Sequence, residues 1–359
     1  MQASKQWATR PDDERFVSLT ELNAHCQAIK FASKATVVPS RAIRCEPLVG
    51  DNSGLMVAGP NGGQVALTHW SFGQLAQRVA APAGYLRSLP APMAADCINY
   101  GLYHRDVEDI GVLLYKNGGP AQMRAVTGPA YGRIWNSTVT QALVDRFGDG
   151  ITGDFRVPGE FGKHVDVTRE NTTLYASDRD MFVFLADEQH RIEIPNRRNG
   201  ESGSLARGFF VWNSEVGSST LGISTFLFDY VCCNRIVWGA TQYKEVRIRH
   251  TASGAMRWID EVAPAIEQYA NSSTASVVQA IEGARKARLD NVDDFLAKRF
   301  SRSQVASIKA AHLDDEQRPI ETLWDVATGV TAYARNIQFQ DARVDLEREA
   351  GKILDLATV

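Results

Sequence analysis

Residues 207–217 read RGFFVWNSEVG, an aromatic stretch that runs into polar residues, and this segment decides the fold of the chain. It predicts a β-strand followed by a turn. In a regular strand, Phe209 and Val211 lie on one face, and we expect them in the core. Phe210 and Trp212 then lie on the opposite face. That second pair requires another explanation, either a second packed layer or a ligand.

The β-rich pattern extends in both directions from this strand. The helix-like spacing of Ile134–Phe147 predicts one amphipathic helix before it, ended by Gly148. The polar, Gly- and Ser-rich residues Asn196–Arg207 predict a mobile loop. Further predicted strands cover Thr172–Ala176, Met181–Ala186, Leu221–Phe228 and Lys244–His250. We therefore expect a central antiparallel β-sheet with helices over residues 120–250.

The flanking regions differ from this centre. Residues 1–119 mix predicted helices, such as Leu19–Ile29 and Ser71–Val79, with hairpins at Gly-rich turns, and form a mixed α/β N-terminal region. Residues 251–359 show helical spacing throughout. The helices expected there are Met256–Tyr269, Ala275–Arg288, Val292–Phe300, Arg302–His312 and Pro319–Ile353. The predicted fold class is α+β, with an all-helical C-terminal module.

Composition places the chain among ordinary globular proteins. It has 359 residues, of which 44% are hydrophobic and 23% charged, with a formal net charge of -3. No apolar stretch is long enough to span a membrane, and the N-terminus shows no apolar signal core. None of the five cysteines forms a CxxC motif. We expect a reduced cytoplasmic protein that does not associate with a membrane.

Common catalytic motifs are missing from the sequence. There is no GxxxxGK[ST], no GxGxxG opening a helix, no GxSxG and no HExxH. We therefore predict no catalytic residue, no metal and no cofactor. Carboxylates at Asp106, Glu108 and Asp109, or at Asp178 and Asp180, would suit a divalent metal in a nuclease, but a solvated connection and a hairpin turn are simpler interpretations.

The charge balance excludes a protein that coats nucleic acid by bulk positive charge, so any contact requires a local patch. In Lys244–His250, Arg247 and Arg249 share one strand face, opposite Val246 and Ile248. A basic and aromatic sheet face would bind a single strand, although a solvated edge strand carries the same pattern. The predicted nucleic-acid-binding residues are Arg197, Arg198, Arg207, Phe210, Trp212, Lys244, Arg247 and Arg249.

Four segments together carry a family resemblance. They are Ala125–Asn136 (AVTGPAYGRIWN), Trp212–Gly217 (WNSEVG), Val231–Asn234 (VCCN) and Leu323–Thr331 (LWDVATGVT). Their order resembles that of the phage/plasmid-like proteins grouped as domain of unknown function (DUF) 932, from about Leu67 onward. Arg235 stands where the family commonly has a glycine. The resemblance implies a phage, prophage or plasmid gene acting in bacterial cytoplasm, and it assigns no catalytic residue.

Three functions remain open. By analogy of class and genetic setting, the first is a cofactor-free protein that binds and anneals single-stranded DNA in recombination, as a homo-oligomer, with a host replication or defence protein as a further partner. The second is a metal-dependent nuclease. The third is a protein-binding counter-defence or regulatory factor, whose residues 251–359 carry 13 Lys and Arg against 17 Asp and Glu.

Overall fold

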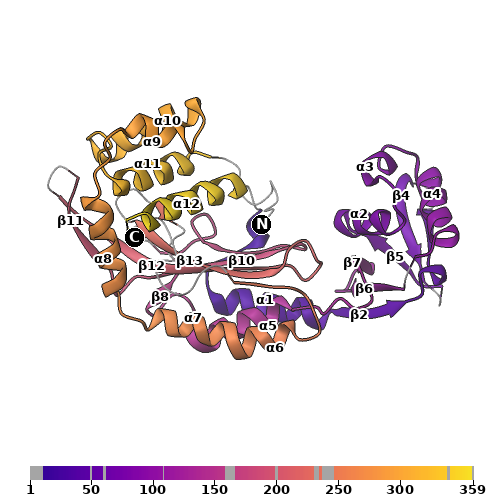
Figure 1. Ribbon diagram of the computed structural model, residues 1–359. Helices are drawn as coiled ribbons and strands as arrows, with labels where there is room; N and C mark the ends of the chain where they lie inside the picture. The colour runs from indigo at the N-terminus through magenta and orange to yellow at the C-terminus, as the bar shows by residue number, and fades with distance from the viewer. Residues whose placement is uncertain are drawn as a thin grey trace.

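The computed structural model describes residues 11–48, 51–59, 62–107, 109–157, 166–198, 201–229, 234–236, 246–337 and 340–357. Two β-sheets, here called the large sheet and the small sheet, carry helices packed on their faces (Figure 1). The C-terminal third is helical. This arrangement confirms the predicted α+β class.

The large sheet is built around two long strands, β12 (Glu201–Asn213) and β13 (Leu221–Asp229), which pair antiparallel. Its main strand order is β1-β9-β10-β12-β13-β14, while β8 pairs with β10, β11 with β12 and β15 with β13. The bounds of these strands are β1 (Arg15–Phe16), β8 (Phe155–Arg156), β9 (Leu174–Ala176), β10 (Met181–Asp187), β11 (Ile192–Arg198), β14 (Asn234–Ile236) and β15 (Val246–Ile248). All of its pairings are antiparallel among the described residues, as the sequence predicted.

The prediction of a mobile loop at residues 196–207 is wrong. The described part of this segment belongs to β11 and β12, with Ile192 opposite Leu205 and Arg198 opposite Glu201. Ile192, Ile194 and Leu205 are buried against the C-terminal helices. The buried residues lie two apart on each strand, and the Gly- and Ser-rich composition concealed this alternation.

The small sheet has the order β2-β6-β7-β5-β4-β3, and only the β5·β7 pair is parallel within the described residues. Its strands are β2 (Ser33–Val38), β3 (Arg44–Leu48), β4 (Asp51–Ala58), β5 (Gln64–Leu67), β6 (Ile110–Tyr115) and β7 (Gln122–Thr127). Helices α2 (His69–Arg78), α3 (Ala83–Leu86) and α4 (Ala91–His104) supply the other half of its core. Helix α2 begins at His69 after a Thr68 cap, two residues before the predicted start at Ser71.

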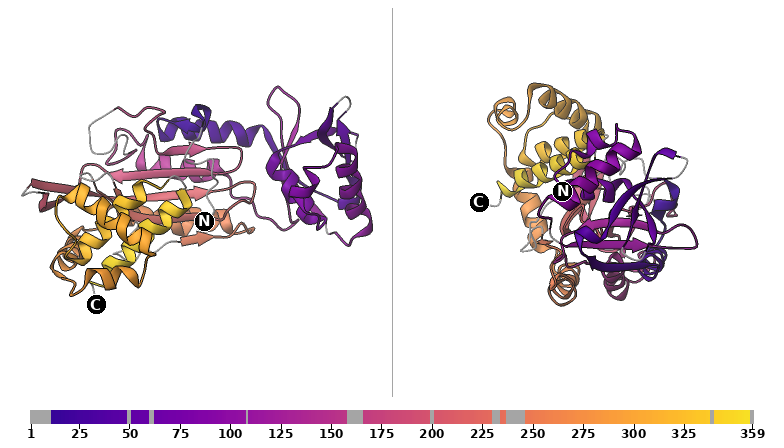
Figure 2. Two further views of the ribbon diagram at one scale, coloured as in Figure 1. Left: turned by 90° about the horizontal axis from the view of Figure 1, so that it is seen from above. Right: turned by 90° about the vertical axis from the view of Figure 1, so that its right-hand side faces the viewer.

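The chain leaves the large sheet to build the small one and then returns. Helix α1 (Leu19–Phe31) packs against α5 (Asn136–Phe147), and the small sheet lies between them in the sequence. Asn23 bridges the two helices, because its Nδ2 donates to Gln141 Oε1 at 2.8 Å and its Oδ1 accepts from Thr140 Oγ1 at 2.8 Å. Figure 2 shows α1 reaching from the large sheet toward the small one.

The sheets thus group the residues differently from the three regions expected from composition. Strand β1 and helix α1 pack with the large sheet, while β7 pairs within the small one. Local composition does not report this grouping, because it arises from pairing between segments that are far apart in the sequence.

Helices cover both faces of the large sheet (Figure 1). One face packs against α1, α5 and the continuous stretch of α6 (Gly254–Arg257), a π-helical turn (Trp258–Val262) and α7 (Ala263–Ala270). Pro264 lacks the N–H that an α-helical bond to the preceding turn requires, and the π-helical turn lies just before it.

The C-terminal helices form the layer on the opposite side. They are α8 (Ala275–Lys286), α9 (Val292–Ala297), α10 (Arg302–Glu316), α11 (Leu323–Arg335) and α12 (Gln340–Asp355). The single helix predicted for Pro319–Ile353 is therefore wrong. Helix α11 begins at a Thr322–Asp325 capping box and ends at Asn336, and α12 packs back against it.

Strand β12 lies between two hydrophobic cores. This explains why aromatic residues occupy both of its faces. Phe209 and Val211 join the core beneath α1 and α5. Phe210 and Trp212 face the other way and pack with Phe226 and with Val344 of α12. Both aromatic residues are 1% exposed. The second packed layer is the correct alternative, so the prediction that Phe210 and Trp212 stack on bases is corrected.

Replacing Trp212 with alanine should lower the free energy of unfolding by about 3–5 kcal/mol, because a buried aromatic ring is lost and the surrounding layer closes only in part. Urea denaturation followed by circular dichroism measures the change. The matched control is Tyr100→Ala, because Tyr100 is 66% exposed, and its effect should stay within about 0.5 kcal/mol. Unchanged stability in Trp212→Ala would contradict the buried placement.

Candidate functional site

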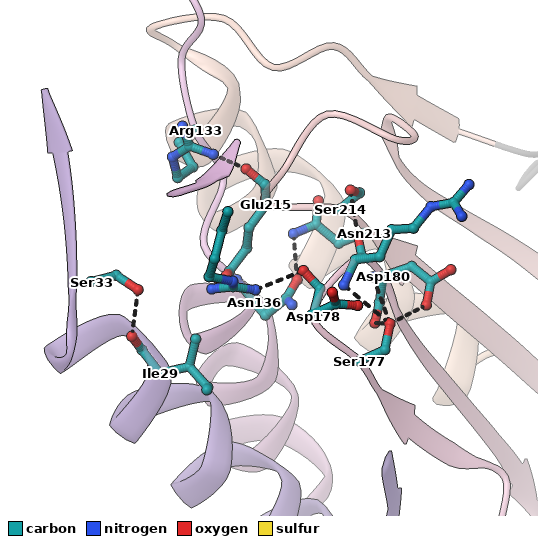
Figure 3. A network of polar contacts seen from close by, with 12 residues as sticks. Ile29, Ser33, Arg133, Asn136, Ser177, Asp178, Asp180, Asn213, Ser214 and Glu215 are labelled. Atoms are coloured by element: carbon teal, nitrogen blue, oxygen red, sulfur yellow. Dashed lines mark hydrogen bonds and ion pairs between the residues drawn. The ribbon is translucent and has the colours of Figure 1, made fainter. Parts of the chain in front are cut away.

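The two sheets meet where the turn after β12 contacts β7 and the start of α5 (Figure 3). Glu215 lies in this turn and is 2% exposed. Its Oε1 accepts a hydrogen bond of 2.8 Å from the backbone N–H of Asn136, the first residue of α5. Its Oε2 lies 3.3 Å from Nη1 of Arg124 on β7. One carboxylate therefore joins three elements, and it occupies the end of α5 where a negative charge is stabilised.

Two further arginine contacts complete this ion pair. Arg124 Nη2 donates to the carbonyl oxygen of Asp178 at 2.9 Å, in the turn between β9 and β10. The Arg133 guanidinium donates to the carbonyl oxygen of Glu215. The side chains of Arg124 and Glu215 are 6% and 1% exposed, so each charge depends on the other for compensation.

Helix α2, which packs on the small sheet, forms hydrogen bonds with the same turn. Trp70 Nε1 and Gln74 Nε2 both donate to the carbonyl oxygen of Val216, at 3.0 Å and 2.7 Å. Gln74 Oε1 accepts from the N–H of Val126 on β7 at 2.9 Å. The turn ends at Gly217, whose φ of +81° favours glycine. The polar residues after β12 therefore hold the two sheets together.

The side chains of Asn213 and Ser214 form hydrogen bonds that hold the turn in place. Asn213 Nδ2 donates to the carbonyl oxygen of Ile134 at 2.9 Å and to Asn136 Oδ1 at 2.7 Å. Ser214 Oγ donates to the carbonyl oxygen of Arg179 at 2.6 Å. Both residues are fully buried. These polar side chains therefore bond within the fold around the predicted turn.

Cationic and aromatic side chains alternate beside this network, and we call them the junction ladder: Lys30, Trp135, Arg133, Tyr131 and His250. Lys30 Nζ lies 6.0 Å from the Trp135 ring centroid, and the Arg133 guanidinium carbon lies 5.9 Å from that ring and 5.2 Å from the Tyr131 ring. Tyr131 and His250 stack with centroids 5.0 Å apart and ring planes at 7°. Lys30 is exposed, and the other four side chains are half-buried.

Partial burial shifts the titration of the ladder. Burial, reinforced by the nearby Arg133 charge, lowers the pKa of His250 to about 4. The same loss of solvent raises the pKa of the Tyr131 hydroxyl and lowers that of Arg133. His250 is therefore neutral near pH 7, and its Nδ1 accepts a hydrogen bond of 3.2 Å from the N–H of Ile134.

Arg207 does not belong to an exposed basic face, which corrects its predicted role. It is 3% exposed, and its Nη2 lies 3.5 Å from Asp187 Oδ2. The same guanidinium donates to the carbonyl oxygens of Ala270 at 3.0 Å and Ser272 at 2.7 Å, where α7 ends. Arg207 thus ties α7 to the large sheet and has no path to a phosphate.

The other predicted basic residues divide into three groups. Arg247 and Arg249 are exposed while Ile248 between them is buried, as the alternation predicted. Arg197 and Arg198 belong to β11, for which the structure describes the backbone. Lys244 lies outside the described residues. Of the eight predicted residues, Arg247 and Arg249 are those placed together on an exposed face.

The acidic clusters considered for a nuclease lie apart from one another. Asp106 and Asp109 are exposed on the connection from α4 to β6, and Glu108 lies outside the described residues. Asp180 is buried in the β9–β10 turn, where its Oδ1 accepts from Ser177 Oγ at 2.9 Å. Within the described part of the chain, no group of three His, Cys, Asp or Glu side chains has the spacing of a metal site.

A cleft opens next to the ladder, on the small-sheet side. Its lining includes Gln77 and Arg78 of α2, Gly128 after β7, Tyr131 of the ladder and Gly217 of the turn. An adjoining hollow shares Arg78, Gly128 and Tyr131 and adds Asp109. The junction ladder and this cleft, both containing Tyr131, form the candidate functional site.

Four of the five ladder residues lie in segments named from the sequence, but they were not predicted to form one site. Tyr131, Arg133 and Trp135 alternate at every second position within the segment YGRIW, and this alternation of aromatic and basic residues is the local signal that was available. Lys30 and His250 come from distant parts of the chain, and nothing local to either residue indicates that they meet.

A family model matches residues 162–352, more than half of the chain, under the description domain of unknown function (DUF932). The protein belongs to this family. The turn segment Trp212–Gly217 and the start of α11 lie within the matched range, whereas Ala125–Asn136 precedes it. Val231–Cys233 lies outside the described residues. No curated protein and no solved structure matches the chain.

Among the described residues, none of the helices has both the length and the apolar character needed to cross a bilayer.

His250 makes the stability of the junction depend on pH. Its pKa is about 4 when folded and about 6.5 when unfolded, so the unfolded chain binds more protons between these values, and stability is lost as pH falls through that window. The loss should be about 3 kcal/mol. His250→Asn, which keeps an acceptor for the Ile134 N–H, should flatten this part of the curve of unfolding free energy against pH.

The control for this measurement is His69→Asn, because His69 lies on an exposed surface of α2. Denaturant titrations from pH 4 to pH 7 compare the three proteins. If His250→Asn and the unmodified protein lose the same stability over this range, His250 does not cause the effect.

Proposed function

We propose that the protein binds single-stranded DNA along the junction ladder and anneals complementary strands in recombination, without a cofactor. We further propose that it acts in bacterial cytoplasm as a product of a phage or plasmid. The observation that carries the proposal is the junction ladder, a partly exposed row in which cations and aromatic rings alternate. Stacking on an aromatic ring contributes about 1–3 kcal/mol per base and tolerates any base identity.

The surrounding charges favour a phosphate backbone. Arg249 directly precedes His250 of the ladder, and Arg247 is exposed on the same strand face as Arg249. Glu215 is the carboxylate nearest the centre of the network, but its charge is buried and paired with Arg124. Lys30, Arg247 and Arg249 are the exposed cations near the ladder that we propose contact phosphates, and exposed Asp109 lies on the cleft side of Tyr131.

Annealing requires more than one strand-binding surface, and we propose that copies of the chain assemble to provide them. Light scattering with and without a saturating oligonucleotide measures the assembly. A fluorescence-quenching assay with two complementary strands measures annealing. A monomer that binds DNA but does not accelerate annealing would limit the function to strand binding.

Removing both exposed arginines tests the proposed path of the strand. In Arg247→Ala plus Arg249→Ala, the plot of log affinity against log salt concentration should become less steep. Its negative slope should decrease in magnitude by about 1.4, since each single-strand phosphate contact contributes about 0.7. Fluorescence anisotropy with a labelled thymidine 12-mer over a salt series measures the slope. Single-strand binding should exceed duplex binding in the unmodified protein.

The matched control is Arg41→Ala plus Arg44→Ala. Arg44 begins the edge strand β3 of the small sheet, and Arg41 lies in the turn just before it. Both are exposed, so the control removes the same charge at another place. An unchanged slope in the Arg247 and Arg249 variant would contradict the proposed path. Absence of binding by the unmodified protein at low salt would contradict the function itself.

A further inference from the structure

The cleft beside Tyr131 is large enough to admit a small molecule. Its two adjoining hollows have volumes of about 470 Å³ and about 760 Å³ and share Arg78, Gly128 and Tyr131. Ligand sites of soluble proteins are concave and combine a formed wall with a few convergent polar groups. These hollows are shallow and open to solvent, so polar side chains rather than enclosure would decide what they bind.

Two hydroxyls of the cleft are already fixed by the fold. Thr127 Oγ1 donates to the carbonyl oxygen of Gly111 at 3.3 Å, and Tyr131 Oη donates to the carbonyl oxygen of Ser214 at 3.3 Å. The side chains of Gln77, Arg78 and Asp109 differ, because within the described residues they form no hydrogen bond or ion pair. These three groups are available to a ligand.

Two glycines keep the cleft open. A Cβ atom on Gly128 would lie 3.0 Å from Arg78 Nη2, so a side chain there would displace the guanidinium. A Cβ on Gly217 would lie 3.5 Å from Tyr131 Oη and from Gln74 Nε2. Both glycines belong to the segments that pack at the junction, and the small size of Gly128 leaves room for the Arg78 guanidinium at the cleft.

The charges of the cleft select a neutral ligand with both donors and acceptors. Arg78 and Asp109 line the same hollow, so a phosphate attracted by one would be repelled by the other. Guanine presents two acceptors, O6 and N7, that suit a bidentate arginine. Its N1–H and N2 amino group are donors that suit a carboxylate. Adenine presents a donor at the position of O6, and pyrimidines lack the N7 edge.

We propose that this cleft receives one guanine base of a bound single strand, with Arg78 on the O6 and N7 edge and Asp109 on the N1 and N2 edge. The inference rests on the proposed single-strand function and deepens it. Tyr131 belongs to both the ladder and the cleft, so a strand that follows the ladder has a base beside the opening. The result is a strand-binding protein with a bias toward guanine.

The test compares thymidine 12-mers that carry one central substitution. The guanine oligonucleotide should bind at least about fivefold more tightly than the adenine one, since a bidentate base contact discriminates by about 5- to 150-fold. Adenine is the control for purine stacking. Replacing the guanine by 7-deazaguanine removes the N7 acceptor, and replacing it by hypoxanthine removes the N2 amino group. Each change should reduce the preference.

Variants assign the two contacts. Arg78→Gln and Asp109→Asn should each abolish the guanine preference, measured as the ratio of the affinities for the guanine and adenine 12-mers, so that a general effect of charge on both strands cancels. Arg105→Gln and Asp106→Asn are the matched controls, because both residues are exposed on the neighbouring connection and neither lines the cleft. Thermal melting checks that every variant is folded.

The outcomes separate the two proposals. Equal binding of the guanine and adenine oligonucleotides, with tight binding of the all-thymidine strand, overturns the guanine site and leaves strand binding in place. A guanine preference that persists in Asp109→Asn and Arg78→Gln also overturns the site. No binding of any oligonucleotide at low salt overturns the proposed function and with it this inference.

Discussion

The ion pair between Glu215 and Arg124 is the constraint on which the rest of the structure depends. A buried carboxylate is costly unless its charge is compensated, and here the partners come from β7 of the small sheet and from the N-terminus of α5. Because these partners are fixed to different elements, satisfying the one carboxylate fixes the small sheet against the large one. Trp70 and Gln74 then tighten the same turn from α2. The ladder and the cleft both include residues positioned by this arrangement.

Much of the fold could be predicted from local patterns, and the errors have a common cause. Alternation correctly separated the two faces of β12, because the period of a strand is visible in five residues. It did not reveal what covers Phe210 and Trp212, since that layer includes Val344 of α12, far along the chain. The strands at residues 196–207 were missed for a related reason. Their Gly and Ser residues resemble a loop, and only pairing with distant partners makes them a sheet.

The site was harder to predict than the fold, because its residues become neighbours only after folding. The exposed face of Arg247 and Arg249 follows from strand parity, and the structure agrees. Arg207 has the same residue type but a different environment, in which its two Nη groups contact Asp187 and carbonyls at the end of α7. A sequence records that an arginine is present and not whether its donors are already used. The ladder shows the same limit, since its central alternation is local but both of its ends come from elsewhere.

The position of the ladder would link the proposed strand binding to the assembly of the junction. Lys30 lies at the end of α1, which packs on the large sheet, whereas Tyr131, Arg133 and Trp135 lie on the segment that returns from the small sheet to α5. A strand that contacts all of them interacts best when both sheets are docked. Any ligand that prefers one arrangement shifts the population toward it by its difference in affinity. Single-stranded DNA bound along the ladder would therefore stabilise the same junction that Glu215 and Arg124 hold together. The buried ion pair and the junction ladder therefore both lie where the two sheets meet.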